Sequence, residues 1–130
     1  PNETDRSASM PILITSLVVN ILVAGFFGLA LSLKLAYLAP KLDVVFGPDT
    51  PSRRILACLY LAIAAFSAAA LLCASVRMNI VLVLLPLQIL YKTLTVFVVA
   101  DRKNPVPWCN LVICVIHGAS LWVACADQGV

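Results

Sequence analysis

The chain has 130 residues, of which 62% are hydrophobic and 12% are charged; its mean hydropathy is +1.04 and its net charge is +3. A soluble domain is about 45–50% apolar and about 25% charged, and a chain of this length is too short to bury so large an apolar excess. The composition therefore excludes a soluble enzyme, a nucleic-acid-binding protein and a disordered tail, and it predicts a polytopic membrane protein.

Four long apolar segments predict four membrane-spanning helices. A spanning helix needs about 20 mostly apolar residues, whereas a barrel strand is about ten residues long and alternates between apolar and polar. These segments are long and continuous, so they are helices that satisfy their own backbone hydrogen bonds in lipid. The expected fold is an all-α membrane protein, a four-transmembrane-helix antiparallel bundle in which residues 1–130 form a single transmembrane domain. The predicted helices cover about 11–37, 55–76, 79–100 and 108–126.

The predicted connections between these helices are short. Arg77–Met78 is expected to form a tight turn, and the two prolines of 101–107 are expected to stop one helix and start the next. The longest connection, 38–54, contains a Gly-Pro-Asp-Thr-Pro stretch that is typical of turns. Either Thr50 or Ser52 is expected to cap the helix that follows.

The basic residues predict the orientation in the membrane, because Lys and Arg are enriched in cytoplasmic loops. The face that holds the two longer connections carries six of them, and the opposite face carries only Arg6 and Arg77. We therefore expect an integral protein of the bacterial inner (plasma) membrane, with both termini outside and both longer loops in the cytoplasm. The six are Lys34, Lys41, Arg53, Arg54, Arg102 and Lys103.

Lys92 is the sharpest functional signal, because it lies well inside the third predicted helix. An ammonium at the bilayer centre costs at least about 2.5–3.5 kcal/mol on insertion scales. Counting residues from the cytoplasmic ends of the helices places His117 at the same depth. The hypothesis is a neutral His117 beside a charged Lys92, because two neighbouring cations are costly.

Other polar residues in the spans are expected to join Lys92 in a ligand-binding or partner-docking cluster. Several recur at helical spacing, such as Gln88, Lys92 and Thr95 at i, i+4 and i+7. For each, the alternative is a structural role: a snorkelling lysine, a packed histidine, or hydrogen bonds between helices. The full candidate set is Lys92, His117, Gln88, Tyr91, Thr95, Asn20, Ser67 and Asn110.

The five cysteines are expected to behave mainly as small apolar side chains. The chain has no CxxC motif and no credible Cys/His metal spacing, so neither a redox centre nor a metal or other cofactor is predicted. Cys73 and Cys125 have matching depths near the outer face, which makes a disulfide between them a possibility.

Two classes of function remain, and a membrane enzyme is a distant third because nothing supplies a paired base and nucleophile. The first is a non-enzymatic accessory, assembly or regulatory subunit of a membrane complex, whose Lys92 docks on a partner subunit or which forms a homo-oligomer. The alternative is a midplane binding or transport protein for an anionic or carbonyl-bearing small molecule that uses Lys92 and His117. No Asp or Glu lies in any predicted span, which argues against proton-coupled cation export.

Overall fold

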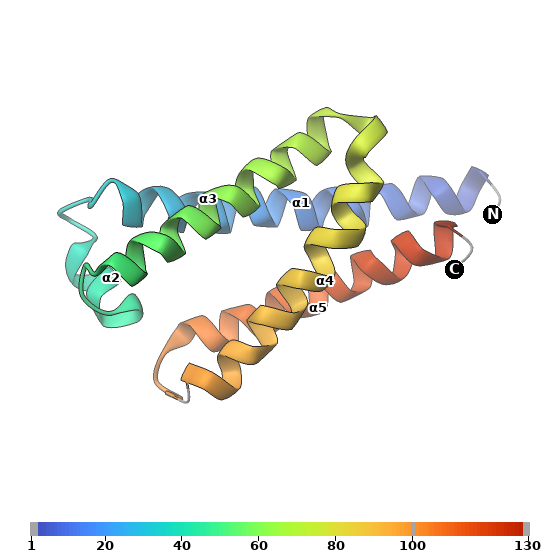
Figure 1. Ribbon diagram of the computed structural model, residues 1–130. Helices are drawn as coiled ribbons and strands as arrows, with labels where there is room; N and C mark the ends of the chain where they lie inside the picture. The colour runs from blue at the N-terminus through green and yellow to red at the C-terminus, as the bar shows by residue number, and fades with distance from the viewer. Residues whose placement is uncertain (1–2, 100, 129–130) are drawn as a thin grey trace.

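The computed structural model describes residues 3–99 and 101–128, and the side chains of residues 10–99 and 101–126. The described residues form an all-α, four-helix membrane bundle, as the sequence predicts, together with one short extra helix (Figure 1). Four of the helices are long and apolar enough to cross a membrane. The helices are α1 (Glu3–Ser32), α2 (Ala39–Phe46), α3 (Pro51–Leu72), α4 (Ala74–Val99) and α5 (Pro105–Gln128).

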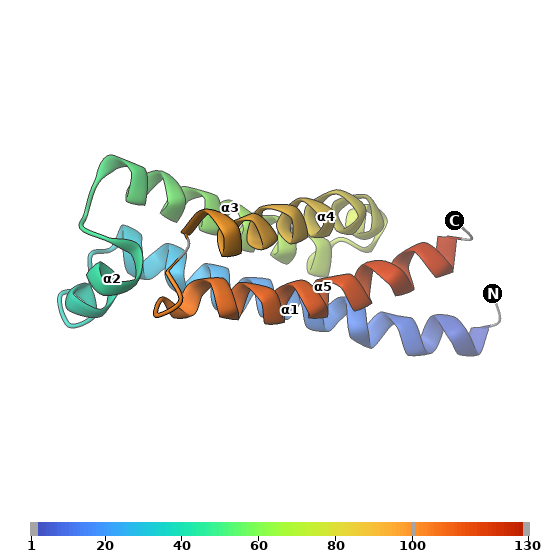
Figure 2. The ribbon, with the colours of Figure 1, turned by 90° about the horizontal axis from the view of Figure 1, so that it is seen from below.

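The four long helices run antiparallel, so that the connections between them gather at two ends. Figures 1 and 2 both place α2 and the 101–104 connection at one end, and the two chain termini at the other. A hydrogen bond joins the two connections directly, because Asn104 Nδ2 donates to the carbonyl of Val45 at 2.9 Å. The two longer connections therefore lie at the same end of the bundle.

The surface of the bundle is apolar and several of its buried side chains are polar, which is the reverse of a soluble protein. Large apolar side chains such as Leu22, Phe66, Val83 and Val115 are more than half exposed. In lipid this exposure costs nothing, whereas polar groups gain by facing one another inside. Among the side chains that the structure describes, nine polar or charged ones are buried: Ser16, Asn20, Arg53, Ser67, Gln88, Lys92, Asn110, His117 and Ser120.

The ends of the first predicted helix differ from the structure. Instead of 11–37, α1 begins at Glu3 and ends at Ser32. The chain leaves the helix at Lys34, which adopts a left-handed backbone conformation with φ of 50°. This conformation is unfavourable for any residue that has a Cβ. The carboxylate of Asp49 holds Lys34 in place at 2.8 Å.

The predicted connection 38–54 contains the short helix α2, which the sequence analysis missed. Pro40 occupies its first turn, where its missing N–H costs nothing. Helix α3 then begins at Pro51 rather than at 55, and Thr50 caps it by accepting a hydrogen bond from the N–H of Arg53. The prediction of a cap at Thr50 or Ser52 is thus confirmed for Thr50.

The turn between α3 and α4 lies at Cys73, so the predicted tight turn at Arg77–Met78 is wrong. The physical reason is the position of the Arg77 guanidinium, which donates to the carbonyls of Ala70 and Leu71 at 2.9 and 3.2 Å. These carbonyls have no partner within the ending helix. Because Arg77 caps them from the first turn of α4, the chain can reverse at one residue. The predicted helix 79–100 corresponds to α4, which begins at Ala74. Its predicted end, residue 100, lies outside the described residues.

The last predicted helix begins earlier than expected. Helix α5 starts at Pro105 rather than at 108, and the side chain of Asn104 accepts a hydrogen bond from the N–H of Val106 at 2.9 Å. Both prolines of this region lie in the first turn of α5, where a missing N–H is tolerated.

We expect Asp49→Asn to weaken the junction between α1 and α3. Arg54 donates to the carboxylate twice at 3.0 Å, and Lys34 lies on the same group. The hydrogen bonds from Arg54 and then Lys34 hold the pKa of Asp49 well below its usual range. The stabilisation is therefore present above the ordinary carboxyl pKa, near pH 4, and is lost as the pH falls below it.

The measurement is thermal unfolding of wild type and Asp49→Asn across pH. A small drop in midpoint is expected at pH 7, since exposed ion pairs contribute little, and the two midpoints should converge in acid. A difference that stays constant down to the lowest pH would contradict the charge-based explanation.

Candidate functional site

Lys92 lies in α4 and is buried, with 5% of its surface exposed. Its Nζ donates to Asn110 Oδ1 of α5 at 3.1 Å. Asn110 Nδ2 in turn donates to Thr95 Oγ1 at 2.9 Å, and that hydroxyl donates to the Lys92 carbonyl at 2.6 Å. The ring of Tyr91 lies 5.2 Å from the ammonium, a distance at which a cation is attracted to an aromatic face. The structure thus brings Lys92, Asn110, Thr95 and Tyr91 together.

His117 belongs to a second cluster, between α5 and α1. Its Nε2 lies 3.0 Å from Asn20 Oδ1, and its Nδ1 lies 3.1 Å from Ser16 Oγ. Ser16 Oγ is also 2.6 Å from Ser120 Oγ, and all four side chains are at most 3% exposed. An amide oxygen only accepts, so a neutral imidazole that is protonated at Nε2 satisfies both contacts.

The structure does not pair Lys92 with His117. Lys92 bonds Asn110, which lies seven residues, or about two turns, before His117 along α5. Three of these seven residues come from the helix start, because the depth count took Trp108 as the start of the helix, whereas α5 begins at Pro105. Counting seven residues inward from Val99 in α4 gives Lys92, and the same count from Pro105 in α5 gives Val112, within one turn of Asn110.

Two of the predicted residues join neither cluster. Gln88 in α4 and Ser67 in α3 are at most 1% exposed, and their polar side-chain atoms have no hydrogen-bond partner within the described chain. The hydroxyl of Tyr91 and the Nδ2 atom of Asn20 also have none. Buried polar groups without hydrogen-bond partners are rare and costly. The described part of this bundle therefore holds unsatisfied donors and acceptors in its interior.

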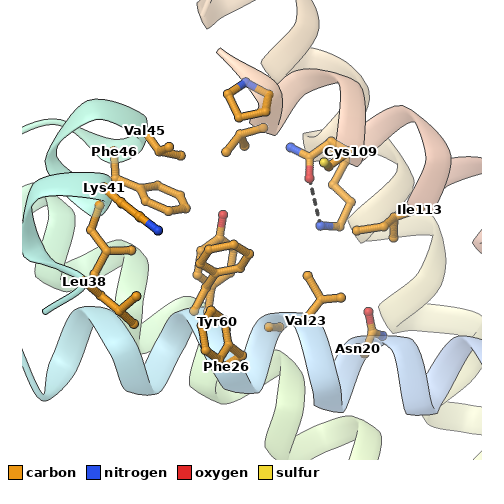
Figure 3. Close-up of a pocket in the computed structure, with 17 residues that line it drawn as sticks. Asn20, Val23, Phe26, Leu38, Lys41, Val45, Phe46, Tyr60, Cys109 and Ile113 are labelled. Atoms are coloured by element: carbon orange, nitrogen blue, oxygen red, sulfur yellow. Dashed lines mark hydrogen bonds between the residues drawn. The ribbon is translucent and has the colours of Figure 1, made fainter. Parts of the chain in front are cut away.

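A cavity of about 250 Å³ lies between the two clusters and the short helix α2 (Figure 3). Lys92 and Asn110 of the first cluster line it, and so does Asn20 of the second. Most of the remaining wall is apolar. Four rings contribute to it, from α1, α2 and α3: Phe26, Phe27, Phe46 and Tyr60.

Sequence analysis missed several residues of this region. Ser16 and Ser120 were not among the candidates, although their spacing indicates a shared face: Ser16 and Asn20 are at i, i+4, and His117 and Ser120 are at i, i+3. Lys41 and Tyr60 line the cavity but carried no signal, because only the placement of α2 brings them to it.

The cysteines add no centre of their own in the described part of the chain. Cys73 and Cys125, the pair considered for a disulfide, are both free thiols, and Cys73 is exposed at the corner between α3 and α4. Within the described residues, no group of three His, Cys, Asp or Glu side chains could hold a metal ion.

Comparison with protein-family models, with curated proteins and with solved structures finds no match to this chain.

Proposed function

We propose that this membrane protein binds or transports a small molecule that presents an anionic or carbonyl oxygen to Lys92. The observation that carries the proposal is a buried ammonium in the wall of a largely apolar cavity. An ammonium has three N–H donors, and Asn110 accepts from one of them. The others are available to a ligand oxygen. A concave apolar site with a few polar groups is the common form of a small-molecule site.

The other hypothesis is an accessory subunit whose Lys92 docks on a carboxylate of a partner. The position of the ammonium supports this reading less. Lys92 is turned into the bundle, and its Nζ is engaged by Asn110 of the same chain. A partner's carboxylate would have to enter the cavity to reach it.

Lys92→Met tests the proposal. We expect the wild-type protein, extracted in a mild detergent, to retain a small molecule that native mass spectrometry detects. Lys92→Met should fold and lose it, since methionine removes the donor together with the cost of burying a charge. Lys103→Met is the matched control, because Lys103 is exposed in the 101–104 connection and should retain the ligand.

Two results would count against this function. If Lys92→Met retains the same molecule, Lys92 has only a structural role through its bond to Asn110. If a protein subunit, rather than a small molecule, accompanies wild type and is lost from Lys92→Met, the docking hypothesis is correct instead.

We further propose that the end with α2 faces the cytoplasm of a bacterial inner membrane. Most of the basic residues lie at this end, which supports the orientation through the positive-inside rule. Ser52 is exposed in the first turn of α3. In a chain whose native cysteines are replaced by alanine, Ser52→Cys should react with an impermeant maleimide only from the cytoplasmic side. Labelling from outside would reverse the orientation.

A further inference from the structure

We infer that the ligand of this cavity is an anion with a ring-bearing apolar body, and that Lys41 and Tyr60 form the second half of its binding site. The inference rests on the proposed function and extends it in two ways. It decides between an anionic and a neutral carbonyl ligand, and it adds two residues that face Lys92 across the cavity.

Lys41 and Tyr60 point into the cavity from α2 and α3 (Figure 3). The Lys41 side chain turns its ammonium toward the cavity, and the Tyr60 hydroxyl also lies there. The Lys92 ammonium, whose bond to Asn110 is the dashed line in Figure 3, belongs to the same wall. Two ammonium groups and one hydroxyl, all hydrogen-bond donors, therefore line a single cavity.

The charge of the lining favours an anion over a neutral carbonyl. Among the described residues that line the cavity there are two lysines and no Asp or Glu. The nearest acid along α2, Asp43, is paired with the Arg53 guanidinium. The two ammonium groups repel each other in an apolar cavity. An anion bound between them attracts both and offsets this repulsion. A neutral carbonyl accepts hydrogen bonds but leaves both charges uncompensated.

The position of Lys41 at the cavity is fixed by hydrogen bonds that hold α2 in place. Arg53, which is 8% exposed, donates both to Asp43 within α2 and to the carbonyl of Gly47 just after it. Asn104 binds the carbonyl of Val45 from the other connection. Because α3 and the 101–104 connection both hold α2, Lys41 belongs to an ordered wall.

The aromatic rings favour a planar, ring-bearing body. The ring of Phe27 lies 5.4 Å from Phe46, and Phe46 lies 6.2 Å from Tyr60; both pairs are edge-on. These rings offer faces and edges at distances that suit a further aromatic ring. A compact aromatic acid matches both the charge and the walls.

The test compares 2-naphthoate with its neutral amide, 2-naphthamide, which has nearly the same shape. Binding is measured by equilibrium dialysis to the protein in nanodiscs of zwitterionic phosphatidylcholine, with empty nanodiscs subtracted. Wild type should bind the acid about tenfold more tightly than the amide, a difference of about 1.4 kcal/mol.

Each variant should alter this pattern in its own way. Lys92→Met should weaken the acid about 10- to 100-fold, since it removes a charged hydrogen bond. Lys41→Met should weaken the acid about two- to fivefold and leave the amide unchanged, because Lys41 is at the exposed mouth. Tyr60→Phe should weaken both probes by similar factors. Lys103→Met should change neither.

Several outcomes would overturn the inference. Equal binding of acid and amide to wild type, with Lys92→Met weakening both, leaves the proposed function standing and shows that charge is not what the site selects. An unchanged acid affinity in Lys41→Met removes Lys41 from the site. If neither probe binds, an aromatic acid is not the ligand, and the molecule that accompanies wild type in mass spectrometry decides separately whether the proposed function survives.

Discussion

Replacing Gly28 with alanine is expected to lower the free energy of unfolding by about 1–3 kcal/mol, the usual cost of overpacking. Gly28 lies where α1 packs closely against α3. A Cβ added there would be 2.9 Å from two side-chain atoms of Leu61 and 3.0 Å from its backbone nitrogen. The side chain of Leu61 can rotate, but its backbone nitrogen moves only with α3. The methyl group therefore pushes the two helices apart.

Two other glycines provide matched controls for this substitution. A Cβ at Gly118 meets no atom within 4 Å, and one at Gly25 meets Ala64 at an ordinary 3.6 Å. At both positions alanine should leave stability unchanged or raise it by up to about 1 kcal/mol, because alanine favours a helix over glycine. The measurement is unfolding of the three variants in detergent. If Gly28→Ala is as stable as Gly118→Ala, α1 and α3 are free to separate and the packing described above is incorrect.

His117→Leu is expected to have the second large effect, a loss of about 1–3 kcal/mol. Leucine fills the space but removes both ring nitrogens, which leaves Asn20 Oδ1 without its partner and deprives Ser16 of one contact. Hydrogen bonds between membrane helices contribute less than this on average, about 0.6 kcal/mol each. The larger estimate follows because one residue serves two contacts at full burial.

A double-variant cycle distinguishes the network from a loss of packing. If Ser16 and His117 act together, then Ser16→Ala combined with His117→Leu should cost less than the sum of the two single losses. Additive losses would show that the two residues contribute independently.

The spans could be predicted from the sequence, because length and hydropathy decide them. Their ends could not, because tertiary contacts decide those. The turn after α3 comes earlier than predicted because Arg77 caps the last carbonyls of that helix. Helix α1 ends before Lys34, whose left-handed conformation is supported by the ion pair with Asp49. Helix α2 has only eight residues, too few for a clear periodic signal, and its position depends on Arg53 and Asn104.

The polar residues inside the spans could be picked out by type, since a polar side chain inside a span is costly wherever it lies. Their grouping could not, because an error of three residues in one helix start shifts every depth that is counted from it. Lys92 was assigned to His117 and instead meets Asn110. Lys41 and Tyr60 became candidates only once the cavity was known, since nothing in their own surroundings in the sequence distinguishes them.

The contact between α1 and α5 has a consequence for the order of events during synthesis. Ser16 and His117 are 101 residues apart, so α1 leaves the ribosome long before its partner exists. At about 5–20 residues per second the interval is about 5–20 s. For that time Ser16 and Asn20 are without His117, and lipid offers no replacement. We therefore expect α1 to remain beside the insertion machinery, or to associate with α3 first, until translation delivers the helix that closes the bundle.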